Sequence, residues 1–211
     1  MADFFDEVSE ELKHDQLIKT WKKYSKLIVS LIAIIIISII SYQAYKSWNE
    51  KEIETISAQH FNALEKLENE SFSESKELFL KNSKQKNGYK ILSLFGLAES
   101  NYKQGNFDEM ILNYKTIYED ENIDLYYRYL SRMLSVIKDN SSSFDQQKMT
   151  LDPILNSPSN LQPLASELKV ILLIKFDKIK EAKKALKSLL KRKDISFEQK
   201  NRLELISKIY N

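Results

Sequence analysis

One apolar segment near the N-terminus constrains the fold of this chain more than any other feature. From Leu27 to Tyr45 the sequence reads LIVSLIAIIIISIISYQAY, which is 19 residues without a charge. As an α-helix this segment would be about 28 Å long, close to the hydrocarbon thickness of a bilayer. The weak helix propensity of isoleucine does not oppose this, because a bilayer offers the backbone no hydrogen-bonding partner but itself. We therefore predict a transmembrane helix over residues 27–45.

Aromatic residues flank both ends of the segment, as the interfacial belts of membrane spans do. They are Trp21, Tyr24, Tyr42, Tyr45 and Trp48. A cleaved signal peptide fits less well, because its apolar region is about 7–15 residues long and ends at a small-x-small site, which Tyr42 and Gln43 interrupt here. The other alternative is a buried core helix of a soluble protein. The pattern favours an uncleaved signal anchor.

Positive charge is concentrated before the segment. Lys13, Lys19, Lys22, Lys23 and Lys26 precede it, whereas Lys46 and Lys51 follow it among glutamates. Because lysines close to a span tend to stay in the cytoplasm, we expect residues 1–26 to be cytoplasmic and residues 46–211 to lie across the membrane. Within the first 26 residues, Phe5, Val8 and Leu12 have helical spacing, which fits either a short amphipathic helix or a solvated tail that only sets orientation.

The chain after residue 50 repeats its apolar residues at helical intervals, with short polar breaks. Three Gly and three Pro in 211 residues also argue against a sandwich or barrel, which needs frequent turns. We predict an all-α fold in which the anchor is followed by antiparallel helix pairs. The helices are expected at about 50–67, 71–83, 90–104, 107–119, 124–138, 144–156, 162–176, 178–191 and 196–209.

The segment from Leu94 to Tyr114, LFGLAESNYKQGNFDEMILNY, resembles a tetratricopeptide repeat (TPR). Leu97-Ala98 stand where that family has Leu-Gly, and Gly105 can end the first helix in the left-handed conformation. Phe107 then opens the second helix, and Tyr114 takes its later aromatic position. The unit is degenerate rather than consensus. Leu94, Asn101, Met110 and Asn122 replace the tryptophan, tyrosine, alanine and proline of the family, and we expect Met110 to widen the pair or change its crossing angle.

Weaker units surround this one, as an α-solenoid requires. Seventy-two residues later, Ile179, Ala182, Leu186 and Leu189 align with Phe107, Met110, Tyr114 and Ile117. Residues 125–158 and 52–83 fit two further units, and 197–210 fits a capping helix. Their inward faces are expected to carry Leu125, Tyr129, Met133 and Val136 in the former and Ile53, Ile56, Phe61 and Leu64 in the latter. An unrelated helical bundle is the alternative.

Catalytic motifs are absent from the sequence. It has no Cys, two His and no Walker, dinucleotide or nucleophile-elbow pattern. We interpret His60 as a packed or surface histidine and His14 as solvated, while Asp108-Glu109 fits a helix N-terminus. We therefore expect a non-enzymatic protein with no cofactor, metal or small-molecule substrate.

Charge is unevenly distributed across the predicted domain. Residues 175–211 carry a net +7, whereas residues 46–174 carry a net −4. The basic cluster Lys183-Lys184, Lys187 and Lys191-Arg192-Lys193 fits contact with anionic lipid or with an acidic partner. The alternative is a set of lysines that only solvate the outer face of the last helices. Nucleic acid is not an expected ligand across the membrane.

The complete layout resembles the bacterial YfgM-like family, the ancillary subunits of the SecYEG translocon. The resemblance is carried by the charged opening from Asp3 to Tyr24, the single anchor and the degenerate TPR unit at 94–114. It implies an inner-membrane anchor with a periplasmic domain at 46–211. It also implies an adaptor beside the translocon that links emerging polypeptides to periplasmic chaperones. Two alternatives remain: an anchored scaffold for another envelope assembly, such as division or wall synthesis, and a structural homo-oligomer.

TPR domains generally bind ligands on the concave surface built by the first helix of each pair. By this resemblance the candidate partner-binding residues are Leu92, Phe95, Glu99, Tyr102 and Lys103. Aromatic and charged side chains there would give adaptable contacts to an extended or helical segment. Ordinary packing between repeats accounts equally well for Phe95 and Tyr102.

Overall fold

Every element of the described chain is an α-helix, which confirms the predicted fold class. The computed structural model describes residues 2–85 and 88–210, with side chains from residue 18 onward except at positions 20, 28 and 29. The side chains of Phe5, Val8 and Leu12 therefore lie outside the described part. The helices are α1 (Ala2–Glu68), α2 (Phe72–Asn82), α3 (Tyr89–Lys103), α4 (Phe107–Glu119), α5 (Leu125–Lys138), α6 (Phe144–Leu155), α7 (Gln162–Lys175), α8 (Ile179–Leu190) and α9 (Phe197–Tyr210). From α2 onward each begins and ends within one residue of its predicted range.

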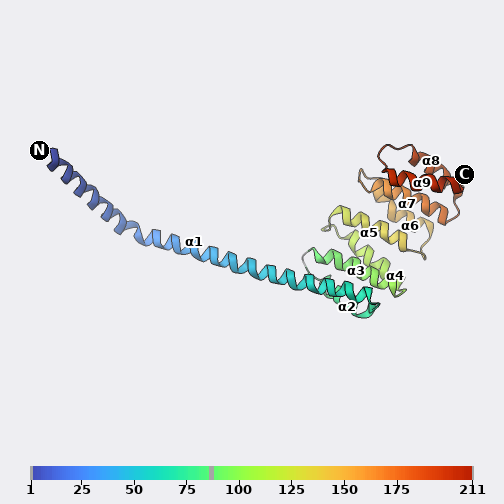
Figure 1. The fold of residues 1–211 in the computed structure, drawn as a ribbon, viewed down its shortest axis with the longest axis horizontal. Coiled ribbons are helices and arrows are strands. Elements are labelled where there is room, and N and C mark those ends of the chain that lie inside the picture. The colour runs from blue at the N-terminus through green and yellow to red at the C-terminus, as the bar shows by residue number, and fades with distance from the viewer. Residues whose placement is uncertain (1, 86–87, 211) are drawn as a thin grey trace. The chain divides into compact units, whose positions relative to one another are not determined.

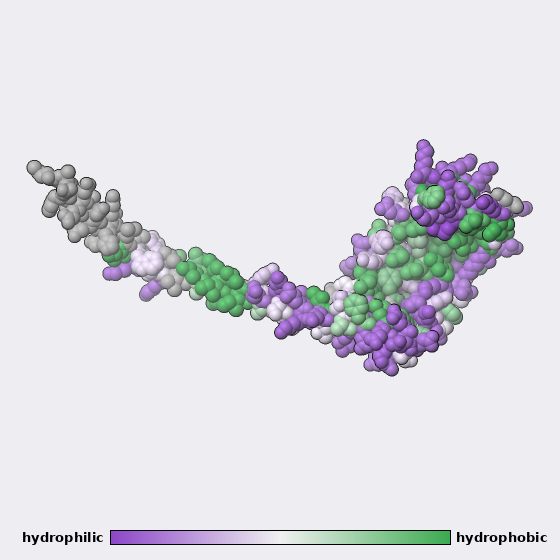
Figure 2. Space-filling model, in the orientation of Figure 1, coloured by the Kyte–Doolittle hydropathy of each residue, from purple (hydrophilic) through white to green (hydrophobic). Residues whose placement is uncertain are grey.

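The chain divides into two compact units, residues 1–55 and residues 56–211, and α1 contributes to both. In the first unit, α1 carries the apolar segment as a continuous hydrophobic band (Figure 2) with none of its most apolar 18-residue window buried. Among the described helices, α1 is the one long and apolar enough to cross a membrane. The helices expected at 27–45 and at about 50–67 are joined without interruption in α1. No Gly or Pro interrupts the backbone there, and a Lys46–Glu50 pair at 3.8 Å joins successive turns.

In the second unit the helices stack in chain order (Figure 1), each packing on the next. The end of α1 pairs with α2 through hydrogen bonds from Ser75 to Ala63 and from Asn82 to Ile56. Helix α3 pairs with α4, α5 with α6 and α7 with α8, and α9 covers α8. The apolar core is accordingly divided into three serial clusters. These centre on Phe79, Met110 and Tyr114, then on Leu151, Ile154 and Leu172, and finally on Val170, Leu186 and Leu203. A core built by neighbours alone is characteristic of a solenoid.

The same helix–helix turn occurs three times in this unit. Glu70, Gly105 and Asp177 each adopt a positive φ, of 61°, 77° and 55° respectively. At Gly105 the backbone N–H of Asn106 donates to the carbonyl of Asn101 at 2.8 Å, and that of Gly105 donates to Tyr102 at 3.0 Å. This pair of bonds is the Schellman arrangement that satisfies the last carbonyls of a helix.

Equivalent bonds occur at the other two turns, from Ser71 to Lys66 at 2.9 Å and from Lys178 to Leu173 at 2.8 Å. The three left-handed positions are therefore 35 and then 72 residues apart, which is one repeat length followed by two. The third helix pair, α5 and α6, is joined differently. Between α5 and α6 the chain has a longer turn that ends in a Ser143–Gln146 capping box.

Burial supports most of the proposed repeat alignment. Met110, Tyr114 and Ile117 are at most 2% exposed, and their counterparts Ala182, Leu186 and Leu189 are at most 4% exposed. Met110, which stands where the TPR family has an alanine, is fully buried. In the third helix pair, Tyr129, Met133 and Val136 of α5 are buried as predicted.

Three of the expected inward residues face solvent instead. Phe61 is 62% exposed, Ile53 40% and Leu125 51%. Ile56 is buried as predicted and Leu64 packs against the core, but His60 and Ala63 take the fully interior positions of α1.

Candidate functional site

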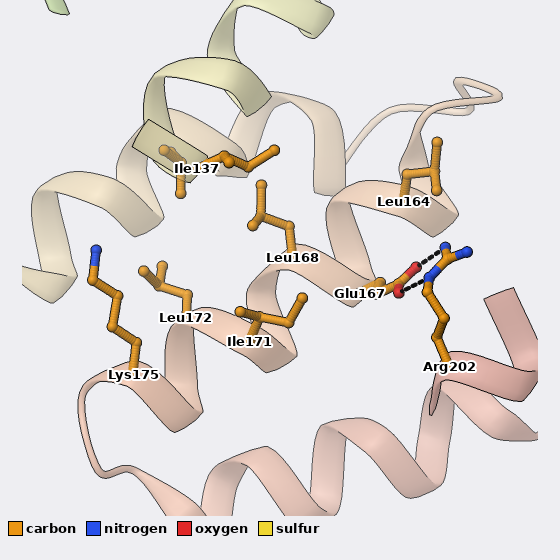
Figure 3. A pocket seen from close by; sticks show the side chains of 9 residues that line it. Ile137, Leu164, Glu167, Leu168, Ile171, Leu172, Lys175 and Arg202 are labelled. Carbon is orange, nitrogen blue, oxygen red and sulfur yellow. Dashed lines mark hydrogen bonds and ion pairs between the residues drawn. The ribbon is translucent and has the colours of Figure 1, made fainter. Parts of the chain in front are cut away.

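The clearest candidate site is an apolar groove of about 350 Å³ where α5, α7 and α9 meet. We call it the α7 groove because α7 supplies most of its lining. The lining residues are Val136, Ile137, Leu164, Glu167, Leu168, Ile171, Leu172, Lys175 and Arg202. Six of these nine side chains are aliphatic, so the groove offers apolar surface with polar groups only toward its ends (Figure 3).

The helical repeat of α7 explains how one helix forms both the core and the groove. Leu168 and Leu172 are 8% and 2% exposed and form the base of the groove, where they also belong to the core cluster shared with α5 and α6. Leu164 and Ile171 lie seven residues apart, two turns along the same face, and are 39% and 45% exposed. Ile137 of α5, 55% exposed, stands across from them. Apolar side chains are thus presented to solvent on a rigid, well-packed base.

An ion pair borders one end of the groove. The two nitrogens Nε and Nη2 of Arg202 each donate to Glu167 at 2.8 Å, one to each carboxylate oxygen (Figure 3). The Glu167 side chain is 8% exposed, while that of Arg202 is 51% exposed. This bidentate hydrogen bonding raises the pKa of Arg202 and gives the buried carboxylate its partner. The pair joins α9 to α7 and so holds the groove wall in place.

Lys175 stands at the other end, where its ammonium donates to the backbone carbonyl of Asp139 and to Oδ1 of Asn140. The Asp139 carboxylate in turn accepts hydrogen bonds from the backbone of Ser141 and Ser142 in the α5–α6 turn. Burial raises the pKa of its carboxyl, but hydrogen bonds from Ser142 and Ser141 outweigh this and leave the pKa below its ordinary value. The α5–α6 turn is therefore an ordered, charged border to the apolar groove.

The residues expected from sequence to bind a partner lie on α3, outside the α7 groove. Leu92 is 44% exposed and Lys103 is also exposed. Glu99 pairs with Lys138 of α5 at 2.5 Å, and the same lysine ammonium lies 4.0 Å from the ring centre of Tyr102. Phe95 is half-buried with its ring 6.2 Å from that of Tyr114. The structure brings Glu99 and Tyr102 together through Lys138 and leaves Leu92 open.

The repeat offset relates these α3 residues to the groove. Moving Leu92, Glu99 and Lys103 by 72 residues gives Leu164, Ile171 and Lys175, and moving Phe95 gives Glu167. All four of these lie in the groove. The signal that could have found them was the 72-residue shift already used for the second helices. Ile137 and Arg202 come from α5 and α9, and no repeat offset in the sequence indicates that they line the groove.

His60 packs in the interior of the first repeat. Its ring centre lies 5.4 Å from that of Phe79 and 5.4 Å from that of Tyr89, and its Nδ1 lies 3.3 Å from the hydroxyl of Ser93. Burial lowers the pKa of His60. Among the side chains that the structure describes, no cluster of three or more His, Asp or Glu residues could hold a metal ion.

A family comparison agrees with this architecture. The model of the tetratricopeptide repeat-like domain matches residues 19–205. This chain belongs to that family. The match begins before the apolar segment and runs into α9, so it takes in the apolar segment together with the helix pairs. Comparison with curated proteins and comparison with solved structures each gave no match. The TPR-like domain is thus a protein-interaction scaffold by family, and its partner has to be inferred from its surface.

Proposed function

We propose that this protein is a membrane-anchored TPR-like adaptor that holds a peptide-binding groove beside the Sec translocon. In this role it would link emerging secreted polypeptides to chaperones. The observation that carries the proposal is the α7 groove, because an apolar channel on a rigid repeat scaffold suits an unfolded chain better than a small metabolite.

The chemistry of the groove suits an adaptor with many clients. Leu164, Ile171 and Ile137 offer apolar contact that does not depend on a particular client sequence. The ends of the groove are polar, so a bound segment can continue into water on either side. Such contacts are individually weak, and this fits transient transfer of a polypeptide rather than a permanent complex.

The anchor supports the location. The apolar segment 27–45 has the length of a span, and exposed aromatic side chains flank it. Trp21, Tyr24, Tyr42, Tyr45 and Trp48 are all 45–68% exposed. With lysines concentrated before the segment, the proposed topology is single-pass in the bacterial inner membrane, with residues 1–26 in the cytoplasm and the domain after residue 45 in the periplasm.

Site-specific crosslinking in living cells tests the adaptor role. A photo-crosslinking amino acid would replace Ile171 in the groove or Leu92 on α3, and the control would replace Leu112 of α4, which is 61% exposed. We expect adducts with translocon subunits, chaperones or secreted chains from the first two positions and few from Leu112. Adducts with other envelope proteins would favour a scaffold for a different assembly. Adducts with this chain alone would favour a homo-oligomer, and equal labelling at all three positions would refute a specific groove.

Cysteine labelling tests the topology separately, because the chain has no native Cys. Ser73→Cys on α2 should react with a membrane-impermeant maleimide once the outer membrane is permeabilised, whereas Ser9→Cys should react only after the inner membrane is opened. The opposite pattern would invert the orientation, and the translocon proposal would fail with it.

A further inference from the structure

We propose that the α8–α9 end of the domain is a second membrane contact, a site for an anionic phospholipid surface. The proposal concerns a surface separate from the α7 groove and does not depend on which protein occupies that groove. It starts from α8, which presents an unbroken cationic face. Lys180, Lys183, Lys184, Lys187 and Lys191 fall within an arc of about 100° at 100° per residue. Figure 2 shows mostly hydrophilic residues over this part of the surface.

No described carboxylate neutralises this face. All five lysines are exposed, and none of them forms an ion pair with any residue that the structure describes. Lys180 and Lys184, Lys183 and Lys187, and Lys187 and Lys191 are each four residues apart, a spacing at which like charges destabilise a helix. Glu181, the acidic residue of α8, lies outside this arc, about 60° from Lys184 around the helix, and pairs with Lys178 at 3.9 Å. A face that is merely solvated would be expected to mix both signs of charge.

A pocket lies beside this face, between α8 and α9. It has a volume of about 330 Å³ and is lined by Lys183, Leu186, Lys187, Leu190, Ser207 and Tyr210. The ammonium groups of Lys183 and Lys187 suit a phosphate oxygen, and the two leucines suit the glycerol and first methylenes beneath it. The combination is typical of a phospholipid headgroup rather than of a fully hydrated ion.

The adjoining helix α9 exposes apolar side chains that solvation does not explain. Phe197, Leu205 and Ile209 are 74%, 60% and 73% exposed. Together, α8 and α9 carry both the lysines and the exposed aromatic and aliphatic residues that are found in helices at a membrane interface. An acidic protein partner would account for the lysines, but the charge, the pocket and the apolar side chains together favour the lipid surface.

Quenching of a fluorophore in nanodiscs tests the contact on the full chain. The label would be placed on Ser188→Cys of α8, or on Ser73→Cys of α2 as the control, and the quencher would be a nitroxide-headgroup lipid. Both serines are exposed, and α2 and α8 belong to different ends of the helix stack. We expect quenching at position 188 in discs containing phosphatidylglycerol, weaker quenching in phosphatidylcholine alone, loss of the difference in high salt, and little quenching at position 73.

Charge variants decide the mechanism. Each lysine near an anionic surface strengthens the contact about fivefold, so Lys183→Gln with Lys187→Gln should lower its equilibrium constant about 25-fold. The matched control is Lys81→Gln with Lys84→Gln on exposed positions at the α2 end, which should change little. Leu205→Ser with Ile209→Ser should also weaken quenching. Equal quenching in neutral and anionic discs would overturn the proposal. The proposal would also be overturned if the lysine variant kept its quenching but lost a crosslink to an acidic protein. Crosslinks from Ile171 would still report the adaptor role independently.

Discussion

Gly96 of α3 is where a single methyl group should matter most to this fold. A Cβ placed at Gly96 would lie 2.5, 2.6 and 2.7 Å from three carbons of the Phe79 ring, where ordinary contacts are 3.4–4 Å. Phe79 is fully buried, and its ring also contacts His60. The ring would have to retreat by about 1 Å into a filled core. The close approach of α2 and α3 thus depends on the missing side chain.

The expected loss of stability follows from two opposing terms. Overpacking a rigid core costs about 3 kcal/mol at the upper end of its usual range, and replacing a helical glycine by alanine returns about 1 kcal/mol. Gly96→Ala should therefore lower the free energy of unfolding by about 2 kcal/mol, which is about 4–8 °C in Tm for a domain of this size. Gly88→Ala is the matched control, because a Cβ there meets nothing within 4 Å, and it should change stability by less than about 0.5 kcal/mol.

Thermal unfolding of the full chain in detergent, followed by tyrosine near-ultraviolet circular dichroism, measures the effect. Both tryptophans lie on α1 outside residues 56–211, whereas eight of the eleven tyrosines lie within them, so tyrosine mainly reports the domain. Adding Phe79→Leu should relieve the overlap, and the double variant should be more stable than the sum of the single changes by about 1 kcal/mol or more. Wild-type stability in Gly96→Ala, or strict additivity with Phe79→Leu, would refute the close-contact argument.

Three further predictions concern the turns, the buried histidine and the groove. Asp177→Gly should stabilise the protein by about 0.5–1 kcal/mol and Gly105→Ala should destabilise it by about 1 kcal/mol, because both positions are left-handed; urea unfolding would show the opposite signs. Because burial lowers the pKa of His60 below 6.5, stability present above pH 6.5 should fall as the pH drops toward the folded-state pKa, and His60→Gln should flatten that change in melts from pH 7 to pH 5. Arg202→Ala should cost about 2 kcal/mol, since it leaves Glu167 buried without its partner, whereas Glu167→Leu should cost less because Arg202 is half exposed; the reverse order in chemical denaturation would contradict this.

Helix positions and turn types were predictable because they depend on local chemistry. The spacing of apolar residues located every helix from α2 to α9, and Gly105 marked a left-handed cap. The same logic located the breaks at Glu70 and Asp177 but not their left-handed conformation, because ordinary residues adopt it there. There the packing of the flanking helices imposes a backbone that the local sequence does not favour.

The sequence by itself determined that this chain would be an apolar helix followed by stacked helix pairs. That information lies in hydrophobic periodicity and in the length of an uncharged run, and both can be read one segment at a time. Only the tertiary structure decided which side chains meet. Ile137, Ile171 and Arg202 form one groove although they come from three helices, and Phe79 fills the space that Gly96 leaves. Such contacts depend on how whole helices are rotated and spaced. Packing against all of the neighbouring helices determines both.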